Sequence, residues 1–187
     1  MKERRTARKS ETLAGQLLLA HPALRDPNFK RSVILLSAHT SDGAMGVVLN
    51  RPLDQQLGEL NTEFAFGPLA GVPVYAGGPV EPEQLIIVSW QWLEAESAFQ
   101  LHFGIEPERA AEIVGQPGVT LRAFVGYSGW GKGQLENEMK HDTWLVSAVE
   151  GEILGQADGT ALWRQILGSI DPELKLLADE PDDPTVN

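Results

Sequence analysis

Apolar residues along this chain gather in short runs separated by polar turn residues, which predicts strands more often than helices. Residues 31–38 give the clearest example. They contain Val33-Ile34-Leu35-Leu36, a continuous apolar run of strand length that is typical of burial on both faces. Further strands are expected at residues 13–20, 47–49, 72–75, 84–90, 99–103, 119–125 and 143–149.

One pair of these strands is close enough to form a hairpin. The gap at residues 41–43 is short and contains an Asp-Gly step, which favours an antiparallel connection. Gly43-Ala44-Met45-Gly46 is interpreted as the turn that leads into the strand at residues 47–49.

Helices are expected at residues 107–115, 134–140 and 160–167, with a short last helix from residue 171. Pro107 suits a first helical position, and Gly115 suits a helix end. Thr160 is the expected cap of the third helix and Gly168 its expected end, while Asp171 caps the last one.

Strands therefore outnumber helices, and strict β-α-β alternation is not seen. This pattern predicts an α+β single domain with a large mixed, mostly antiparallel sheet flanked by helices. We expect a flexible basic tail at residues 1–12, one domain at residues 13–177, and an acidic flexible tail at residues 178–187.

Composition narrows the possible chemistry. The chain has no cysteine, which excludes disulfides, thiolate metal sites and cysteine nucleophiles. Its net charge is −11. Residues 1–9 carry five basic residues and one acidic residue, so the other 178 residues carry −15. Such a domain repels nucleic acid. No apolar run approaches the ~20 residues of a membrane span, so we expect no membrane partner and a cytoplasmic location.

The most unusual stretch is 124–136, where a strand is expected to run into a loop with four glycines and two aromatic residues before a helix. Its spacing approaches a phosphate-binding loop, because Gly126 is followed after four residues by Gly131-Lys132. The next position is Gly133, where magnesium chemistry needs a hydroxyl. A tight structural turn with Trp130 packed on the core is the favoured interpretation.

Other candidate groups do not converge on a reaction. Gly77-Gly78-Pro79 is either a turn or a wall that a ligand can approach, and Arg51 is expected to pair with a carboxylate. Glu136 and Glu138 lie two residues apart on a predicted helix and are interpreted as part of its solvent-exposed face. The four histidines and Ser128 fit no metal or triad motif, so we predict no catalytic residue, no metal and no cofactor.

A contact surface for a ligand or partner is expected instead, combining the glycine-rich stretches with neighbouring polar and aromatic groups. Its predicted members are Asn50, Arg51, Gly77, Gly78, Pro79, Gly126, Tyr127, Gly129, Trp130, Gly131 and Gln134.

Several motifs in fixed order resemble the YqgE/AlgH family of bacterial proteins. The matching motifs are Leu13-x-Gly15-x-Leu17-Leu18, Asp26-Pro27-x-Phe29-x-Arg31-Ser32-Val33, Asn50-Arg51-Pro52, Gly77-Gly78-Pro79-Val80, and Gly126-Tyr127-x-Gly129-Trp130 with Gly133-Gln134-Leu135-Glu136. The resemblance implies a mixed α+β fold and a family without an established activity, whose members are often labelled transcriptional regulators.

Three functions remain open from the sequence. The leading one is a non-enzymatic binding or regulatory protein that meets an unknown protein or small molecule. The second is direct DNA binding, which the family label suggests and the charge opposes. The third is an enzyme or anion-binding protein that uses residues 126–133.

Overall fold

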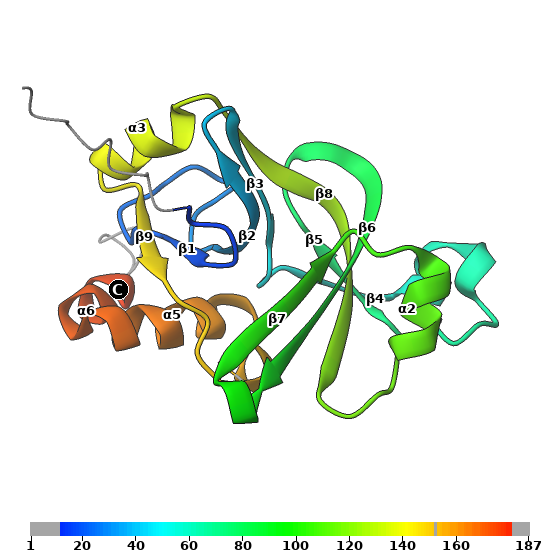
Figure 1. The fold of residues 1–187 in the computed structure, drawn as a ribbon. Helices are drawn as coiled ribbons and strands as arrows, with labels where there is room; N and C mark the ends of the chain where they lie inside the picture. Colours follow the sequence, from blue (N-terminus) through cyan, green and yellow to red (C-terminus); the bar gives the residue numbers. More distant parts are fainter. Residues whose placement is uncertain (1–11, 152, 181–187) are drawn as a thin grey trace, which may run out of the picture.

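The computed structural model describes residues 12–151 and 153–180, which form one α+β domain around a curled sheet (Figure 1). Its strands are β1 (Leu17–Ala20), β2 (Val33–Thr40), β3 (Gly43–Val48), β4 (Pro52–Gln56), β5 (Pro73–Ala76), β6 (Val80–Leu93), β7 (Ala98–Phe103), β8 (Val119–Gly131) and β9 (Trp144–Ser147). Its helices are α1 (Leu57–Leu60), α2 (Pro107–Ile113), α3 (Gln134–Lys140), α4 (Ile153–Gln156), α5 (Gly159–Ile170) and α6 (Pro172–Ala178), with 3-10 turns η1 (Thr62–Phe64) and η2 (Glu94–Glu96).

The sheet is mixed and mostly antiparallel, which confirms the fold class expected from the sequence. Hydrogen-bonded neighbours follow the order β4-β5-β8-β3-β2-β1-β9, and the β6–β7 hairpin joins the sheet at β8. Among the strand pairs that the structure describes, the β5–β8 pair alone is parallel. In Figure 1, β9 (yellow) and β7 (green) mark two ends of the curled sheet.

β8 is shared by two halves of the sheet, one formed with β1, β2, β3 and β9 and the other formed with β4, β5, β6 and β7. Its first part pairs with β6, and residues 128–131 pair with β3. From the sequence this strand was expected to end at Val125 and to be followed by a loop, and that prediction was wrong. The glycines stay extended because β3 supplies a partner strand, with Gly129 opposite Met45 and Gly131 opposite Gly43.

The antiparallel hairpin expected near residues 41–43 is confirmed. Thr40 pairs with Gly43, so Ser41 and Asp42 alone form the turn. The stretch 43–46, expected as a turn, is therefore strand. Glycine is needed within it because a Cβ at Gly46 would lie 2.4 Å from the carbonyl oxygen of the neighbouring strand β2.

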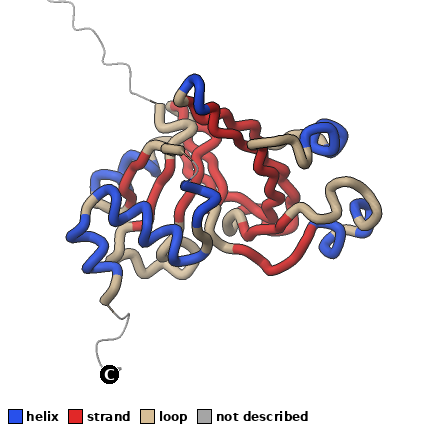
Figure 2. Tube along the Cα trace, turned by 90° about the horizontal axis from the view of Figure 1, so that it is seen from below, coloured by secondary structure: helices blue, strands red, loops and turns tan. Residues whose placement is uncertain are grey.

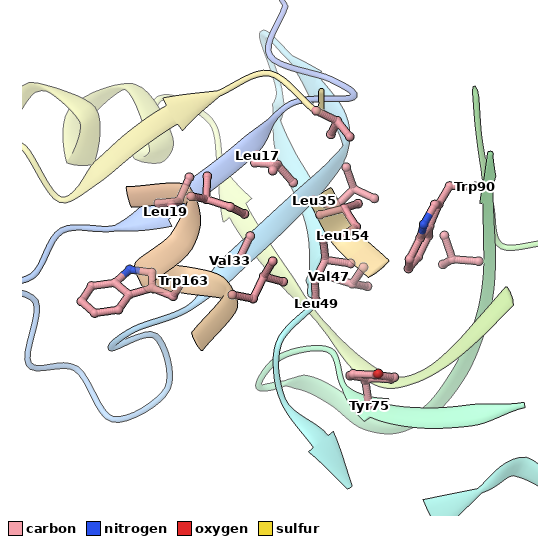
Figure 3. Packing of buried hydrophobic residues seen from close by; sticks show 14 of the residues in the cluster. Leu17, Leu19, Val33, Leu35, Val47, Leu49, Tyr75, Trp90, Leu154 and Trp163 are labelled. Carbon is pink, nitrogen blue, oxygen red and sulfur yellow. The ribbon is translucent and has the colours of Figure 1, made fainter. Parts of the chain in front are cut away.

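The main core fills the concave side of the sheet. It combines alternate apolar residues of β1 and β2 with Tyr75 and Trp90 from the other half of the sheet, and with the apolar face of α5 (Figure 3). Trp163 of α5 is buried, and its Nε1 donates to the Ala20 carbonyl oxygen at 2.9 Å. Two further clusters lie under α3 and against α1 and α2. Figure 2 shows the strands in the middle of the molecule with the helices around them.

Two details of the C-terminal helices differ from the expectation. Asp158, rather than Thr160, caps α5, since its Oδ1 accepts from the Gly159 amide at 2.9 Å. Gly168 lies inside α5 and does not end it. A Cβ at Gly168 would lie 2.9 Å from Cδ of Lys175, so the stem of this α6 lysine packs over the glycine of α5. The expected helix at 134–140 and the start of α6 after Asp171 are confirmed.

The first strand is shorter than expected. It begins at Leu17 rather than at residue 13, because residues 14–15 form a turn in which Gly15 has a φ of 80°. Of the expected tails, residues 1–11 and 181–187 lie outside the described residues. Within the described part of the chain, no helix has the length and apolar content needed to cross a membrane.

Candidate functional site

The two glycine segments singled out in the sequence lie against each other. Gly77 and Gly78 connect β5 to β6 and run beside Gly126 of β8. The Gly77 amide donates to the Val125 carbonyl oxygen at 2.9 Å, and a Cβ on Gly78 would lie 2.2 Å from the Tyr127 carbonyl oxygen. A Cβ on Gly126 would lie 2.4 Å from the Gly78 carbonyl oxygen. The contact is backbone against backbone, so these glycines close the fold and leave no open pocket between the two segments.

The outer side of this contact is partly accessible. Pro79 is exposed, and Tyr127 and Gly129 are half-buried, with the Tyr127 ring 3.5 Å from the position that a Cβ on Gly129 would take. The use of this rim as a surface for a partner stays a prediction.

Residues 126–133 do not form a phosphate-binding loop. Such a loop needs backbone N–H groups that converge on an anion. Here residues 128–131 are instead paired with β3, and the helix that follows Gly133 has seven residues. The nucleotide and anion hypothesis therefore loses the geometry that suggested it.

Trp130 packs on the core, as expected, and a carboxylate holds it there. Its Nε1 donates to Glu138 Oε2 at 2.9 Å, and Trp144 Nε1 donates to the same oxygen at 2.8 Å. Gln134 donates to Glu138 Oε1 at 3.0 Å and accepts from the Gly131 amide at 3.0 Å. Glu138 is half-buried rather than part of a solvated face, because α3 lies across β3 and β8 and turns this position inward.

Glu136, two positions earlier, is exposed and points elsewhere. The Leu13 amide donates to Nδ1 of His39 at 3.0 Å, so the ring proton is on Nε2, which donates to Glu136 Oε1 at 2.7 Å. This hydrogen bond lowers the pKa of Glu136. The two glutamates therefore stabilise separate contacts and do not form an acid–base pair.

Asn50 is a structural residue in this fold. It is 4% exposed, and its Oδ1 accepts from the Val33 amide at 2.9 Å. Its Nδ2 donates to the carbonyl oxygens of Arg31 and Gly159, each at 2.9 Å. These three bonds join the β2 entry, the end of β3 and the start of α5, so the amide is fully occupied.

Arg51 was expected to pair with a carboxylate, but its hydrogen bonds go to main-chain oxygens. The guanidinium donates to the carbonyl oxygens of Asn28 and Lys30 in the turn before β2. Burial lowers its pKa, and the charge of Asp26 opposes that shift. Arg51 therefore fixes the 28–30 turn against the end of β3.

A buried cation that the sequence analysis did not single out joins the two halves of the sheet. Arg122 of β8 is 7% exposed and donates to the carbonyl oxygens of Leu49 at 3.0 Å and Leu154 at 3.2 Å. Its guanidinium carbon lies 4.3 Å from the ring centroid of Tyr75 and 5.0 Å from that of Trp90. Cation–π contacts with two rings and hydrogen bonds to two carbonyl oxygens offset part of the cost of burying this charge.

The phenol of Tyr75 extends this network to α5. Its hydroxyl donates to Asp158 Oδ2 at 2.7 Å, and Asp158 also caps the helix. Burial and this hydrogen bond raise the pKa of Tyr75 to about 12. Burial also lowers the pKa of Arg122, while the charge of Asp158 opposes the shift.

Beside this network lies an open pocket of about 280 Å³, here called the aromatic pocket. Trp90, Trp92 and Phe99 of the β6–β7 hairpin line one side, and Leu154 of α4 lies on the other. Trp92 and Phe99 are half-buried, so their rings are accessible. None of the described residues that line the pocket titrates, and Thr120 contributes a hydroxyl. The arrangement suits a flat apolar group with one hydrogen-bonding substituent.

The alternation Trp90-x-Trp92, which begins at the end of the strand expected at residues 84–90 and continues two residues beyond it, was a usable signal for this pocket together with Phe99 in the next expected strand. It placed two large aromatic side chains on the same face of one strand. The contribution of Leu154 carried no comparable signal. Among the described residues, no group of three or more His, Asp or Glu side chains is placed to hold a metal ion.

Comparison with known proteins identifies relatives along nearly the whole chain. A UPF0301 protein of Streptomyces coelicolor is 38% identical over 191 residues, which covers 94% of this chain and 96% of the relative. A UPF0301 protein of Magnetococcus marinus is 37% identical over 182 residues, which covers 91% of this chain and 96% of the relative.

Two solved structures are similar in fold. The AlgH protein from Pseudomonas aeruginosa gives a TM-score of 0.67 at 26% identity and covers 98% of this chain and 100% of its own. A Corynebacterium diphtheriae protein gives 0.68 at 22% identity, with 96% and 95% covered, and at that identity the likeness shows the fold alone. The AlgH-like family matches residues 17–175, and this chain therefore belongs to the AlgH-like family that its sequence motifs resemble.

Proposed function

We propose that this protein is a non-enzymatic binding protein whose ligand inserts a flat, uncharged aromatic group into the aromatic pocket. The observation that carries the proposal is the convergence of Trp90, Trp92 and Phe99 on one open concavity next to Leu154. Ligand pockets are concave, mostly apolar and provided with a few polar groups. The volume of about 280 Å³ suits a one- or two-ring group rather than a large cofactor.

The chemistry of the pocket supports binding rather than catalysis. Its described lining offers indole and phenyl faces with the Thr120 hydroxyl, and it offers no titratable side chain for proton transfer. The neighbouring Arg122 is occupied by two carbonyl oxygens and two rings, so it stabilises the wall.

The two alternatives from the sequence gain no support. The stretch 128–131 is strand and does not cradle an anion. The −15 carried by residues 10–187 opposes direct DNA binding.

A panel of indole, phenol and naphthol fragments tests the proposal by ligand-observed NMR. We expect fragments to bind the wild-type chain and to bind the Phe99→Ala variant roughly tenfold more weakly, because one stacking face is lost. The matched control is Phe66→Ala, since Phe66 is fully exposed and lies outside the pocket. If no fragment binds at about 1 mM, or if Phe99→Ala binds as tightly as the control, the proposal is wrong.

A further inference from the structure

The sheet has three strand edges that lack a neighbour among the described residues, on β4, β7 and β9. Natural proteins protect such edges from pairing with other chains by proline, charge, bulges or short length. β4 has Pro52, the charged Asp54 at a φ of 52°, and a register shift in its pairing with β5. β9 has only four residues.

β7 lacks all of these protections. It has six residues, Ala98–Phe103, and contains no proline and no Asp, Glu, Lys or Arg. Its pairing with β6 runs from Leu93↔Ala98 to Val88↔Phe103 without a bulge. Phe99, Leu101 and Phe103 pack on the core yet stay partly exposed. The edge is therefore a regular template with an apolar face that one more strand would cover.

The sequence of β7 is complementary to a second copy of itself in an antiparallel pair. Directly opposite residues in an antiparallel pair share a face. In a two-fold pairing centred on Leu101, each Phe99 lies opposite the partner's Phe103, and Leu101 lies opposite its own copy. On the other face each Gln100 lies opposite the partner's His102. Apolar residues meet apolar ones, and polar residues meet polar ones, over residues 99–103.

We propose that a second copy of this chain pairs antiparallel along the free edge of β7, so that the sheet continues across a symmetric dimer. Charge favours this face for self-association. The chain carries −11, so two copies repel where acidic surfaces meet, whereas β7 brings none of the 26 acidic residues to its own edge.

The same charge distribution predicts how salt acts. Antiparallel pairing brings the start of one β7 beside the end of its partner. Glu94 and Glu96 precede β7, and Glu106 and Glu108 follow it, so like charges approach at both ends. Salt screens this repulsion, and the dimer strengthens as ionic strength rises. A pair of six-residue strands buries less than the ~1,600 Å² of a standard interface, so the expected dissociation constant is roughly micromolar or weaker.

Sedimentation velocity across about 1 µM to 1 mM protein, at low and high salt, tests the proposal. We expect a concentration-dependent dimer that tightens with salt. Gln100 and His102 are exposed, so replacing them should leave the monomer folded, which near-UV circular dichroism checks. The Gln100→Glu, His102→Glu double variant sets like charges opposite each other twice and should weaken dimerisation roughly 2- to 30-fold.

The Gln100→Lys, His102→Glu double variant sets opposite charges at the same two positions and should restore or tighten the dimer. Gln55→Glu with Gln56→Glu, on the exposed edge of β4, is the matched control and should leave the dimer unchanged. A wild-type chain that stays monomeric throughout, or a dimer indifferent to both β7 variants, would overturn the proposal. Hydrogen exchange on the unmodified chain gives a second measurement, because β7 amides should gain protection with protein concentration, and constant protection would also refute it.

Discussion

Asn50 gives the sharpest test of how this fold is held together. Asn50→Ala removes one acceptor and two donors from a site that is 4% exposed. The Val33 amide and the carbonyl oxygens of Arg31 and Gly159 then lose their partners. These groups belong to the entry of β2 and the start of α5, so the substitution loosens the contact between the sheet and its covering helix.

The magnitude follows from the three bonds. A typical hydrogen bond contributes about 1 kcal/mol net, and a buried group left without a partner costs about 1–3 kcal/mol. We therefore expect the free energy of unfolding to fall by roughly 3 kcal/mol for Asn50→Ala, or more where water does not enter. For a domain of this size each kcal/mol lowers the melting temperature by about 2–4 °C, so the expected shift is about 6–12 °C.

Urea unfolding followed by tryptophan fluorescence measures this difference, with Asn137→Ala on the exposed face of α3 as the control. The control should stay within about 0.5 kcal/mol of wild type. Asn50→Asp adds a second test, because the direction in which its destabilisation changes with pH can be predicted. Burial and the two facing carbonyl oxygens raise the pKa of the introduced carboxyl in the folded state above its unfolded value near 4, so its destabilisation should shrink as pH falls toward about 4 and level off below that. An Asn50→Ala variant as stable as the control would refute the reasoning.

Three further substitutions test other contacts. Because the pKa of Tyr75 is raised to about 12 in the folded protein, its protonated phenol stabilises the fold at pH values below its ordinary pKa near 10, and this contribution is lost as pH rises through 12. Tyr75→Phe should therefore flatten the loss of thermal stability between about pH 10 and 12. Gly78→Ala should prevent folding or lower the free energy of unfolding, followed by circular dichroism, by more than about 3 kcal/mol, because the Cβ would lie 2.2 Å from the Tyr127 carbonyl oxygen. The control Gly71→Ala, whose Cβ would have no atom within 4 Å, should fold normally. Glu138→Ala leaves two indole N–H groups without an acceptor and should cost about 2–4 kcal/mol in urea unfolding, with a change in near-UV circular dichroism.

The fold class could be predicted because local patterns decided it. The apolar run at 33–36 is buried in β2, and the Pro107 and Asp171 signals mark true helix starts. These patterns depend on neighbours a few residues apart, and tertiary contacts did not override them. Strand order, by contrast, was not accessible. Nothing in the sequence shows that β8 pairs with β3, β5 and β6.

The glycine-rich stretch was misread because glycine is required for two different reasons. It permits positive φ in turns, and it also permits another backbone to approach within contact distance. Gly126 has a positive φ of 71°, whereas Gly129 and Gly131 are extended. A Cβ on Gly77 would lie 2.3 Å from the Gly126 carbonyl oxygen, so Gly77 illustrates the close approach of a second backbone. Only the partner segment distinguishes the two reasons, and in each case that segment is distant in sequence, as Gly43 is from Gly131 and Gly77 from Gly126.

The roles of the candidate site residues also depend on segments that are distant in sequence. Asn50 and Arg51 were predicted to belong to a contact surface, yet their hydrogen bonds go to main-chain groups from distant segments. Arg122 was overlooked because an arginine in an expected strand usually faces solvent. Its burial depends on Tyr75 and Trp90, which converge on it from β5 and β6.

The aromatic pocket and the joint between the two halves of the sheet depend on the same contacts. Trp90 presents its ring to Arg122 and also lines the pocket. Leu154 lines the opposite side, while its carbonyl oxygen accepts from the same guanidinium. Arg122 therefore links two residues that line the pocket, and its second bond, to Leu49, connects them to the end of β3. A ligand that widens the pocket must strain this joint, so the pocket should favour flat groups that slide between its walls without separating them.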